Sequence, residues 1–473
     1  MVGIVSSGAY IPIYRLNRDE IGRMWGGRGA GGAKAVAGYD EDTITMAVAA
    51  TLDCLERGGA GVNGLFLATT TAPYREKLSA AIVASVADIH EECHTADFTD
   101  SLRATTMAIK SAIDAVKAGS AKSVMMAAAD CRMGAAKGAL EQTLGDGAAA
   151  LMIGSEKVMA EVEGSYSIFN DFTDQWRTAE DTFIRSAEGR FIDEVGYLPT
   201  MQSAITGLMN KYKLKQGDFS RVVYYASDVR QHAALARRMK FEKGQVQDPL
   251  YNDIGNTGTA AVLLMLAAAL EKAKPGDRIL FAGYGDGADA FVLRVTDEIT
   301  RFQRKPILSN KLAGETAISY GQYLSWRNLV PVEASTLPER AALSLPARWR
   351  ERRAISALYG SRCRKCGTPQ ISQIGQTARV CVNCQAKDDF EPYKFSDKKG
   401  KLFSYAIDHL QPTLNPPGVN GVIDFDGGGR MICELTDCEV DKVKIGMPVE
   451  MTYRKMFYSR GIHNYFWKAK PVE

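Results

Sequence analysis

Short apolar runs alternate with stretches of helical periodicity over the first 300 or so residues, and this alternation is typical of an α/β protein. Residues 101–118 predict a helix capped by Ser101, because apolar residues recur there at helical spacing. A second predicted helix, over 259–273, is apolar around most of its surface, which indicates burial between two layers. The predicted strands cover residues 64–70, 123–129, 148–154, 221–227, 278–285 and 290–295.

Two distant segments share one motif. Residues 144–153 read LGDGAAALMI, and residues 284–293 read YGDGADAFVL. Each Gly-Asp-Gly turn leads into an apolar strand and closes an α/β segment of similar length. Self-similarity at a long period predicts a duplicated architecture. We therefore expect two copies of one unit, over residues 1–165 and 166–300, packed back to back.

The last third of the chain has a different character. Residues 301–360 contain isolated prolines and a basic run at 347–353, and we predict a helical linker whose basic run is a solvated helix face. After residue 390, strand-like runs separated by Gly, Asn and Pro turns predict a small OB-type barrel of about five strands over 391–473.

Between the linker and the barrel, residues 361–390 carry two Cys-x-x-Cys pairs. Each pair places two thiolates on one tight turn, and two such turns can close a tetrahedral four-sulfur site suited to zinc. Four cysteine ligands leave no open position for water, so we predict structural zinc in a zinc ribbon. The predicted ligands are Cys363, Cys366, Cys381 and Cys384.

The amino-acid composition limits the kinds of partner, cysteine chemistry and location that we expect for this protein. Hydrophobic residues make up 46% of the 473 residues, and the net charge of +3 indicates neither a polyanionic nor a polycationic partner. Nine cysteines, an odd number, favour thiols and metal ligands over a disulfide framework. No apolar run approaches the ~20 residues of a spanning helix, and the first residues lack a signal-peptide pattern, so we expect a soluble, cytoplasmic protein with no membrane partner.

Taken together, the motifs resemble the thiolase superfamily, in particular its 3-hydroxy-3-methylglutaryl-CoA synthase and ketoacyl synthase III branch. Residues from about 305 onward resemble the zinc-ribbon/OB-fold proteins that accompany thiolase-type enzymes as a separate subunit. The resemblance implies a five-layer αβαβα sandwich, an acyl-CoA substrate, a homodimer formed at a sheet edge and a possible synthase partner subunit. The matching segments are 3–12, 105–119, 145–154, 174–197, 255–264 and 283–291.

The resemblance also implies where the family's catalytic residues belong. The family uses a cysteine at the N-terminus of a buried helix, a glutamate, a histidine and an asparagine. In this chain Leu102, Thr70 and Ser227 occupy the cysteine, glutamate and histidine positions, and only Asn256 is kept. A leucine cannot attack a thioester. We therefore expect C–C chemistry of the aldol or Claisen type on an acyl-CoA, without the usual cysteine nucleophile.

Other residues are candidates to replace the missing groups. Asp286, in the second Gly-Asp-Gly turn, is a candidate base, and Tyr225 and Tyr284 are candidate phenol acids at strand ends. Ser101 stands beside the vacated nucleophile position but has no evident neighbouring base. Cys131 ends a strand, where nothing in the sequence lowers the pKa of its thiol.

Structural roles compete with these catalytic ones. A turn role is favoured for Asp286, because Asp146 holds the equivalent place in the first repeat and Asp in tight turns usually bonds its own backbone. Asp100 and Asp228 flank the vacated nucleophile and histidine positions. For them, too, a structural role is favoured over a catalytic one. His232 is interpreted as a solvent histidine.

Three other functions remain open. The first is a non-catalytic acyl-CoA-binding or scaffolding partner of a thiolase or synthase. The second is standard acyl transfer through another residue, such as Cys131. The third, nucleic-acid binding by the OB module, rests on its aromatic residues and is disfavoured by the acidic run at 436–441.

Overall fold

The computed structural model describes residues 1–59, 61–302, 306, 308–313, 316–333, 340–372 and 378–472. The chain divides into two compact units, and each is described by itself. The first unit holds residues 1–38, 42–84 and 89–323, and the second holds 39–41, 85–88 and 324–473. This division falls at residues 323/324, inside the predicted linker, and the finer boundaries given above stay predictions.

Nine strands of the first unit form one hydrogen-bonded sheet. Its strands are β1 (Gly3–Tyr10), β4 (Gly64–Ala68), β5 (His94–Phe98), β6 (Ser123–Asp130), β7 (Gly147–Gly154), β8 (Ala160–Phe169), β11 (Arg221–Tyr224), β12 (Arg278–Tyr284) and β13 (Gly287–Val295).

The order of these strands contains the same arrangement twice. Along the sheet they run β11-β12-β13-β8-β1-β7-β6-β4-β5. In the first half β4 is parallel to β6, and β6, β7 and β1 are antiparallel neighbours. In the second half β11 is parallel to β12, and β12, β13 and β8 are antiparallel neighbours. The halves meet where β1 pairs with β8 at Gly3 and Ile4, so the predicted duplication is confirmed.

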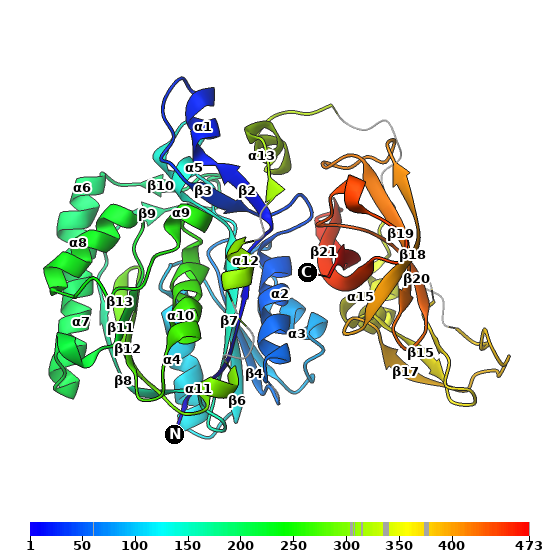
Figure 1. Cartoon of the computed structure of the whole chain (residues 1–473), viewed down its shortest axis with the longest axis horizontal. Helices are drawn as coiled ribbons and strands as arrows, with labels where there is room; N and C mark the ends of the chain where they lie inside the picture. The colour runs from blue at the N-terminus through cyan, green and yellow to red at the C-terminus, as the bar shows by residue number, and fades with distance from the viewer. Residues whose placement is uncertain are drawn as a thin grey trace. The chain divides into compact units, whose positions relative to one another are not determined.

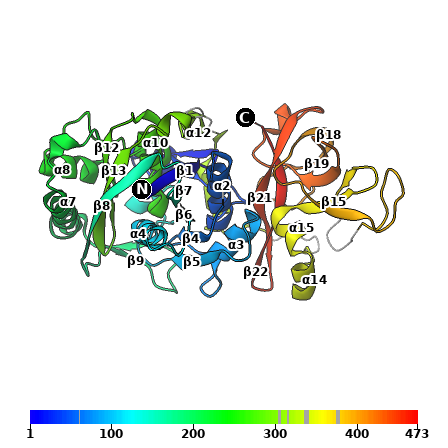
Figure 2. The same ribbon diagram turned by 90° about the horizontal axis from the view of Figure 1, so that it is seen from below.

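Helices complete a five-layer arrangement. The central helices α4 (Ala104–Lys117) and α10 (Ala261–Lys272) each contact strands of both halves. Helix α2 (Thr43–Glu56) packs on β1, β7 and β6, whereas α7 (Leu198–Tyr212) packs on β8, β13 and β12 and against α8 (Val229–Met239). Figures 1 and 2 show the same succession of helices, strands, central helices, strands and helices. The thiolase-like αβαβα fold is therefore confirmed.

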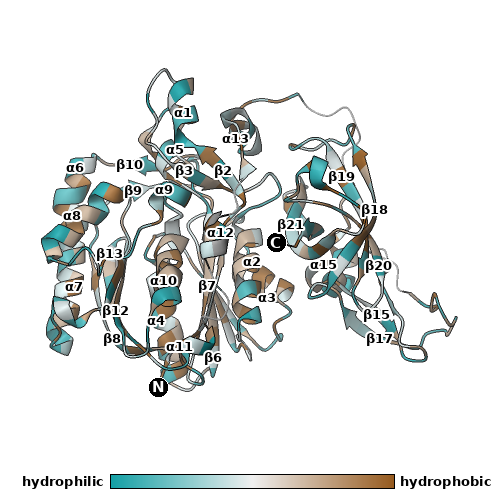
Figure 3. Cartoon of the chain, viewed as in Figure 1, coloured by the Kyte–Doolittle hydropathy of each residue, from teal (hydrophilic) through white to brown (hydrophobic). Residues whose placement is uncertain are grey.

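Burial follows the layers. In α10 the nine consecutive residues from Val262 to Leu270 are buried, as expected for a helix between two layers. Helix α8 instead carries arginines on an exposed face, and Figure 3 shows both hydrophilic and hydrophobic colours along it.

The remaining elements of the first unit lie in its connections. A small sheet is formed by β2 (Tyr14–Asn17), β3 (Ala33–Val36) and β14 (Thr316–Ala317), and a hairpin by β9 (Gln175–Trp176) and β10 (Arg185–Ser186). The other helices are α1 (Arg18–Met24), α3 (Ser79–Val86), α5 (Ala139–Thr143), α6 (Gly189–Phe191), the π-helical η1 (Ile192–Tyr197), α9 (Tyr251–Ile254), α11 (Ile299–Phe302), α12 (Ser309–Ala313) and α13 (Tyr320–Trp326), whose last residues belong to the second unit.

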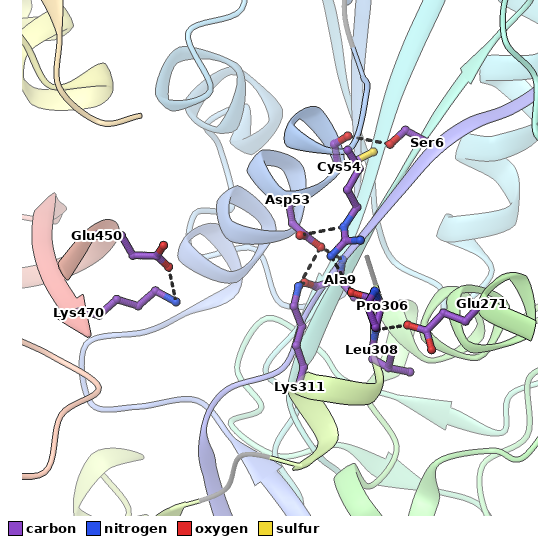
Figure 4. Close-up of polar contacts among 11 residues, drawn as sticks. Ser6, Ala9, Asp53, Cys54, Glu271, Pro306, Leu308, Lys311, Glu450 and Lys470 are labelled. Carbon is purple, nitrogen blue, oxygen red and sulfur yellow. Dashed lines mark hydrogen bonds and ion pairs between the residues drawn. The ribbon is translucent and has the colours of Figure 1, made fainter. Parts of the chain in front are cut away.

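One aspartate of α2, Asp53, joins this helix to α12 near the end of the first unit. Asp53 of α2 accepts hydrogen bonds from the Ala9 backbone N–H at 2.9 Å and from Arg57 Nε at 3.0 Å. It also pairs with Lys311 of α12 at 2.8 Å, as Figure 4 shows. The segment that follows the sandwich is thus fixed to the sheet by a partly buried charge cluster.

The second unit contains two small β structures. Strands β15 (Tyr359–Cys363), β16 (Pro369–Gln370) and β17 (Phe390–Lys394) form the ribbon sheet, and the helices before it are α14 (Leu345–Arg350) and α15 (Arg352–Ala357). The five-stranded barrel sheet runs β20-β19-β18-β21-β22 and confirms the predicted OB-type fold. Its strands are β18 (Lys399–Asp408), β19 (Gly418–Phe425), β20 (Arg430–Glu434), β21 (Pro448–Ser459) and β22 (Ile462–Pro471).

Among the described residues, no helix has the length and apolar character needed to cross a membrane.

Some predicted boundaries differ from the observed ones. Helix α4 begins at Ala104, and its N-cap residue Arg103 makes no side-chain cap bond. Ser101 therefore does not cap the helix; its hydroxyl accepts only a 3.3 Å hydrogen bond from the Arg103 backbone N–H. Strand β11 ends at Tyr224, because the chain there turns toward the N-cap of α8 at Asp228.

Candidate functional site

A cavity of about 610 Å³ lies in the first unit beside Leu102, the residue predicted above to stand at the nucleophile position. Its walls come from the loops after β4 and β5, the end of β6, the β9–β10 region and the second Gly-Asp-Gly turn. Most of the lining side chains are polar or charged. The lining residues used below are Thr70, Ser101, Leu102, Arg132, Asp174, Gln175, Gly285 and Asp286.

The vacated nucleophile position forms part of this wall. Leu102 and Ser101 precede α4 and are partly exposed to the cavity. The turn at Gly285 packs tightly against them, since a Cβ atom there would lie 2.7 Å from Ser101 Oγ. Leu102 therefore borders a cavity, and its assignment to the nucleophile position stays a prediction.

The vacated glutamate position has a structural role. The Thr70 backbone N–H and hydroxyl donate to Asp130 Oδ1 at 2.7 and 3.1 Å, and the Thr259 N–H donates to Asp130 Oδ2 at 2.8 Å. Thr69 and Thr71 donate to the same carboxylate. Asp130 is fully buried, so five hydrogen bonds compensate its charge and join the two halves.

Asn256 keeps its place but its side chain is fully engaged. Its Nδ2 donates to Tyr225 Oη at 2.9 Å and to the Ser227 carbonyl at 3.2 Å, and its Oδ1 accepts from the Gly258 N–H at 3.0 Å. Both amide hydrogens are thus used. Tyr225 is buried, and burial raises the pKa of its phenol, so Tyr225 stays protonated and retains a hydrogen to donate.

The two Gly-Asp-Gly aspartates differ. Asp146 is buried and accepts a hydrogen bond from the Ala37 N–H at 2.8 Å, so it anchors a distant segment rather than its own turn. Asp286 is exposed at the cavity, with a left-handed φ of +45°, and its carbonyl accepts from the Asn170 N–H at 3.2 Å. The catalytic assignment of Asp286 stays a prediction, whereas Asp146 is structural.

Asp174 was missed by the sequence reasoning. It lines the cavity and is hydrogen-bonded to Tyr284, which ends β12 just before the lining residues Gly285 and Asp286. Burial, together with the charge of Asp286, raises the pKa of Asp174 against the hydrogen-bonding effect of Tyr284. Burial and the neighbouring Asp174 likewise raise the pKa of Tyr284 above its ordinary value. A carboxyl group of raised pKa beside a phenol inside a cavity is typical of a proton-transfer site.

Arg103 fixes the start of α4. Its Nε and Nη2 donate to the two carboxylate oxygens of Asp289 at 2.9 Å each, and Thr106 donates to the same carboxylate at 2.8 Å. Asp289 is buried in β13, so a two-pronged ion pair joins the first half's central helix to the second half's sheet.

The remaining candidate residues lie partly at the cavity and partly outside it. Asp228 caps α8 by accepting from the backbone N–H groups of Arg230 and Gln231. Asp100 is exposed at the cavity, and Cys131, which follows β6, lies outside the lining. The prediction for His232 was wrong: it is only 6% exposed and its ring stacks on Tyr224 at 4.5 Å, because α8 turns that face toward the sheet. Burial lowers the pKa of His232 to about 4.

The four predicted metal ligands lie together in the second unit. The Sγ atoms of Cys363, Cys366, Cys381 and Cys384 are all within 4.8 Å of one another. Cys363–Cys384 and Cys366–Cys381 are separated by 3.6 and 3.5 Å. A tetrahedral zinc site with Zn–S bonds of about 2.3 Å places its sulfurs about 3.8 Å apart, so the cluster fits zinc.

Comparison with known proteins supports this architecture. The hydroxymethylglutaryl-CoA synthase of Archaeoglobus fulgidus is 34% identical over 344 residues, which are 70% of this chain and 99% of that protein. The enzyme of the same name from Thermococcus sibiricus is 36% identical over 307 residues, or 63% of this chain and 87% of the relative. The chain belongs to the hydroxymethylglutaryl-CoA synthase family.

Family models match parts of both units. Residues 209–295 match the C-terminal part of 3-oxoacyl-[acyl-carrier-protein] synthase III, and residues 393–454 match the C-terminal OB-fold domain of ChsH2. The predicted fusion of a synthase-like region with an OB-fold domain is therefore confirmed.

Solved structures show the same fold. A synthase of this family complexed with CoA has a TM-score of 0.62 at 19% identity, covering 68% of this chain and 89% of that one. The synthase MvaS in complex with 3-hydroxy-3-methylglutaryl coenzyme A has a TM-score of 0.64 at 20% identity, covering 72% and 94%. At these identities the likeness concerns the fold alone.

Proposed function

We propose that the first unit makes or breaks a C–C bond of a CoA thioester, by aldol or Claisen chemistry, without a cysteine acyl-enzyme. The observation that carries the proposal is the polar cavity at Leu102, which is lined by Asp174, a carboxyl group hydrogen-bonded to Tyr284. Relatives named hydroxymethylglutaryl-CoA synthase and a structure with bound CoA support an acyl-CoA substrate. The replacement of cysteine by Leu102 argues against covalent acyl transfer from that position.

In the cleavage direction, Asp174 would take the proton of a β-hydroxyl group. The Cα–Cβ bond would then break, the β-carbon would leave as a carbonyl, and the electron pair would move into the thioester as an enolate. Return of the proton to the α-carbon completes the reaction, and the reverse sequence forms the bond. Tyr284 stays protonated and would orient the base through its hydrogen bond to Asp174, whereas Tyr225, also protonated, would donate its hydrogen to the developing oxygen charge.

Two carboxylates compete for the role of base. Asp174 is favoured over Asp286 because burial increases its basicity, whereas Asp286 is exposed. We expect Asp174→Asn to lower turnover about 100-fold or more, the usual contribution of a general base. Asp286→Asn would then have a smaller effect. Asp171→Asn, at an exposed position three residues away, is the matched control and should leave turnover unchanged. Equal rates for wild type and Asp174→Asn would remove Asp174 from the mechanism.

A second candidate is a non-catalytic acyl-CoA-binding or scaffolding protein. The replaced positions at Leu102, Thr70 and Ser227 favour it, because Thr70 is fixed to Asp130 and the Ser227 carbonyl is bonded to Asn256. Binding of acyl-CoA without turnover of any thioester would support this candidate and contradict the first.

For the second unit we propose structural zinc held by the four cysteines. Four thiolates complete the tetrahedron, so the metal would stabilise the ribbon and take no part in the reaction. We expect about one zinc per chain by elemental mass spectrometry, and loss of both metal and ribbon stability in Cys363→Ser. Cys93→Ser, at a cysteine outside the cluster, should retain the metal. A wild-type protein purified without metal that keeps the same thermal stability would contradict the proposal.

We also propose a homodimer formed through β5, which ends the nine-stranded sheet. A separate synthase subunit is the alternative partner. Light scattering of the purified protein distinguishes a dimer from a monomer, and a monomer would contradict the dimer.

A further inference from the structure

A buried arginine lines the cavity with an unused hydrogen-bond donor. Arg132, which follows β6, is only 8% exposed, and its Nη2 donates to Gln175 Oε1 at 3.0 Å. Its Nη1 is shielded from solvent and has no hydrogen-bond partner among the described residues. Of the described side chains with such an unbonded buried atom, Arg132 is the one that lines the cavity. A buried donor without a partner is costly, so a ligand oxygen in the cavity would complete its bonding.

The neighbouring carboxylate of Asp130 does not use this donor. A Cβ atom on Gly258 would lie 2.4 Å from Asp130 Oδ2 and 2.8 Å from Arg132 Cδ, so the two side chains are neighbours. The hydrogen bonds to Asp130 come from threonine hydroxyl groups and backbone N–H groups, and none comes from the guanidinium. Asp130 therefore offsets part of the charge of Arg132 and leaves its Nη1 for another acceptor.

Two further arginines of the cavity lining differ from Arg132 because they are exposed. Arg177 donates to the Thr70 carbonyl at 2.7 Å, and Arg75 donates to the Ala179 carbonyl. Water and salt screen the charges of exposed groups, whereas a hydrogen bond to a charged oxygen is stronger in a shielded environment. Arg132 is therefore the cavity arginine best suited to stabilise a charge that develops on a substrate.

Asn256, the residue kept from the family pattern, has no hydrogen left for a substrate. Its two amide hydrogens go to Tyr225 Oη and to the Ser227 carbonyl. Tyr225 lies within electrostatic reach of Arg132: burial raises the pKa of its phenol, and the charge of Arg132 opposes that rise. The guanidinium and the phenol thus form one neighbourhood in which a negatively charged oxygen is stabilised.

We propose that Arg132 is a catalytic residue that binds the carbonyl oxygen of the acyl thioester and stabilises the enolate. The inference rests on the proposed function, because an enolate arises only if this cavity breaks or forms the C–C bond. When the Cα–Cβ bond breaks, its electron pair moves through Cα to the thioester oxygen, which accepts a hydrogen bond from Nη1. Asp174 holds the proton of the β-hydroxyl and returns it to Cα. Arg132 keeps its own protons throughout, because a guanidinium is not deprotonated in proteins.

One residue connects this donor to the proposed base. Gln175 accepts the hydrogen bond of Arg132 through Oε1, and its backbone N–H donates to Asp174 Oδ1 at 2.5 Å. In a β-hydroxyacyl thioester, only Cα separates the carbon atoms that carry the carbonyl and hydroxyl oxygens. The donor for one oxygen and the base for the other must therefore lie side by side, and their shared contact with Gln175 places them so.

Two unreactive CoA analogues test the inference without turnover. In both, a CH2 group replaces the thioester sulfur. One carries a carboxylate in place of the acetyl group and so has the shape and charge of the acetyl-CoA enolate, whereas the other carries a neutral carboxamide. By calorimetry, we expect wild type to bind the carboxylate analogue about 10-fold or more tightly, from one charge-assisted hydrogen bond. Arg132→Met should remove this preference, and Arg132→Lys should keep part of it. Arg294→Met, at an exposed position of β13, is the matched control and should keep all of it.

Turnover provides a second measurement. Loss of one donor to a developing oxyanion typically lowers kcat about 100-fold or more. We expect this loss in Arg132→Met with KM nearly unchanged, because the donor acts more strongly on the charged enolate than on the neutral thioester. A folded Arg132→Met protein with the kcat of wild type would overturn the inference.

The binding comparison can also overturn it. Equal wild-type affinities for the two analogues would do so, and this comparison needs no variant, so a folding defect in Arg132→Met cannot obscure it. An equal loss of affinity for both analogues in Arg132→Met would show that the arginine binds another part of CoA. The proposed function is decided separately: product formation without any preference between the analogues overturns the inference alone, whereas no product from any thioester overturns the proposed function.

Discussion

The two halves of the first unit share one topology, but their equivalent turns have different tasks. Each Gly-Asp-Gly turn packs against the segment that precedes the other half's central helix: Gly145 contacts the Ile254 carbonyl, and Gly285 contacts Ser101. In the first half the turn's aspartate, Asp146, is buried and bonded to the Ala37 N–H. In the second half Asp286 is exposed at the cavity. A repeated motif therefore reports a repeated packing position and not a repeated chemical role.

The largest loss of stability should follow from replacing Asp130, the residue that joins the two halves. Asp130→Ala would leave buried donors of Thr69, Thr70, Thr71 and Thr259 without their acceptor, so we expect a loss of about 4 kcal/mol or more in the free energy of unfolding. Urea denaturation followed by circular dichroism measures it. Asp171→Ala, at an exposed aspartate with an ordinary backbone conformation, should change stability by less than about 0.5 kcal/mol. Similar losses in the two variants would disprove the role of Asp130.

The stability of the protein should depend on pH through His232, a residue of the second half. Burial lowers the pKa of His232 to about 4, from about 6.5 when unfolded, so the folded state holds the neutral ring. Its stabilisation is complete above pH 6.5 and is lost as the pH falls from 6.5 toward 4, because the unfolded chain binds the proton first. We expect wild type to lose about 2 kcal/mol more than His232→Phe between pH 7.5 and pH 5. Parallel pH dependence of the two proteins would contradict this assignment.

The aspartates of the two Gly-Asp-Gly turns should contribute differently to the free energy of unfolding. Asp146→Ala removes the acceptor of a buried backbone N–H, so we expect a loss of about 1–3 kcal/mol in the free energy of unfolding. Asp286→Asn should change it by less than about 0.5 kcal/mol, because the side chain is exposed and Asn adopts the left-handed backbone as readily as Asp. Chemical denaturation of both variants provides the comparison. Equal destabilisation would show that the halves use their aspartates alike.

The fold was largely predictable because continuous segments of the sequence specify its main elements. The apolar helix over 259–273 and the two Gly-Asp-Gly motifs each specify a buried element within a short window of sequence, as do the paired cysteines for their cluster. The position of Leu102 at the cavity also followed from the motif. His232 was misjudged because its spacing from Ser227 says nothing of which face of α8 packs against Tyr224.

The rest of the site is assembled by tertiary structure. Asp174 belongs to the second half and Arg132 to the first, and only the meeting of the two halves brings them to one cavity; Tyr284, at the end of β12, is hydrogen-bonded to Asp174. The segment that begins at Asp174 matches the family in sequence. The role of Asp174, however, depends on its burial, which a local sequence pattern does not reveal. Sequence therefore located the cavity through the residues that were lost and missed the carboxyl group and the guanidinium that it contains.

The central claim is that this cavity breaks or forms a C–C bond without a covalent acyl-enzyme. The most direct measurement is mass spectrometry of the intact protein and of the products after incubation with acetyl-CoA, acetoacetyl-CoA and β-hydroxyacyl-CoA thioesters. We predict no acyl adduct on the protein, and cleavage of a β-hydroxyacyl-CoA into two smaller carbonyl products that Asp174→Asn no longer forms. An acyl adduct on Ser101 or Cys131, or no product from any thioester, would contradict the account.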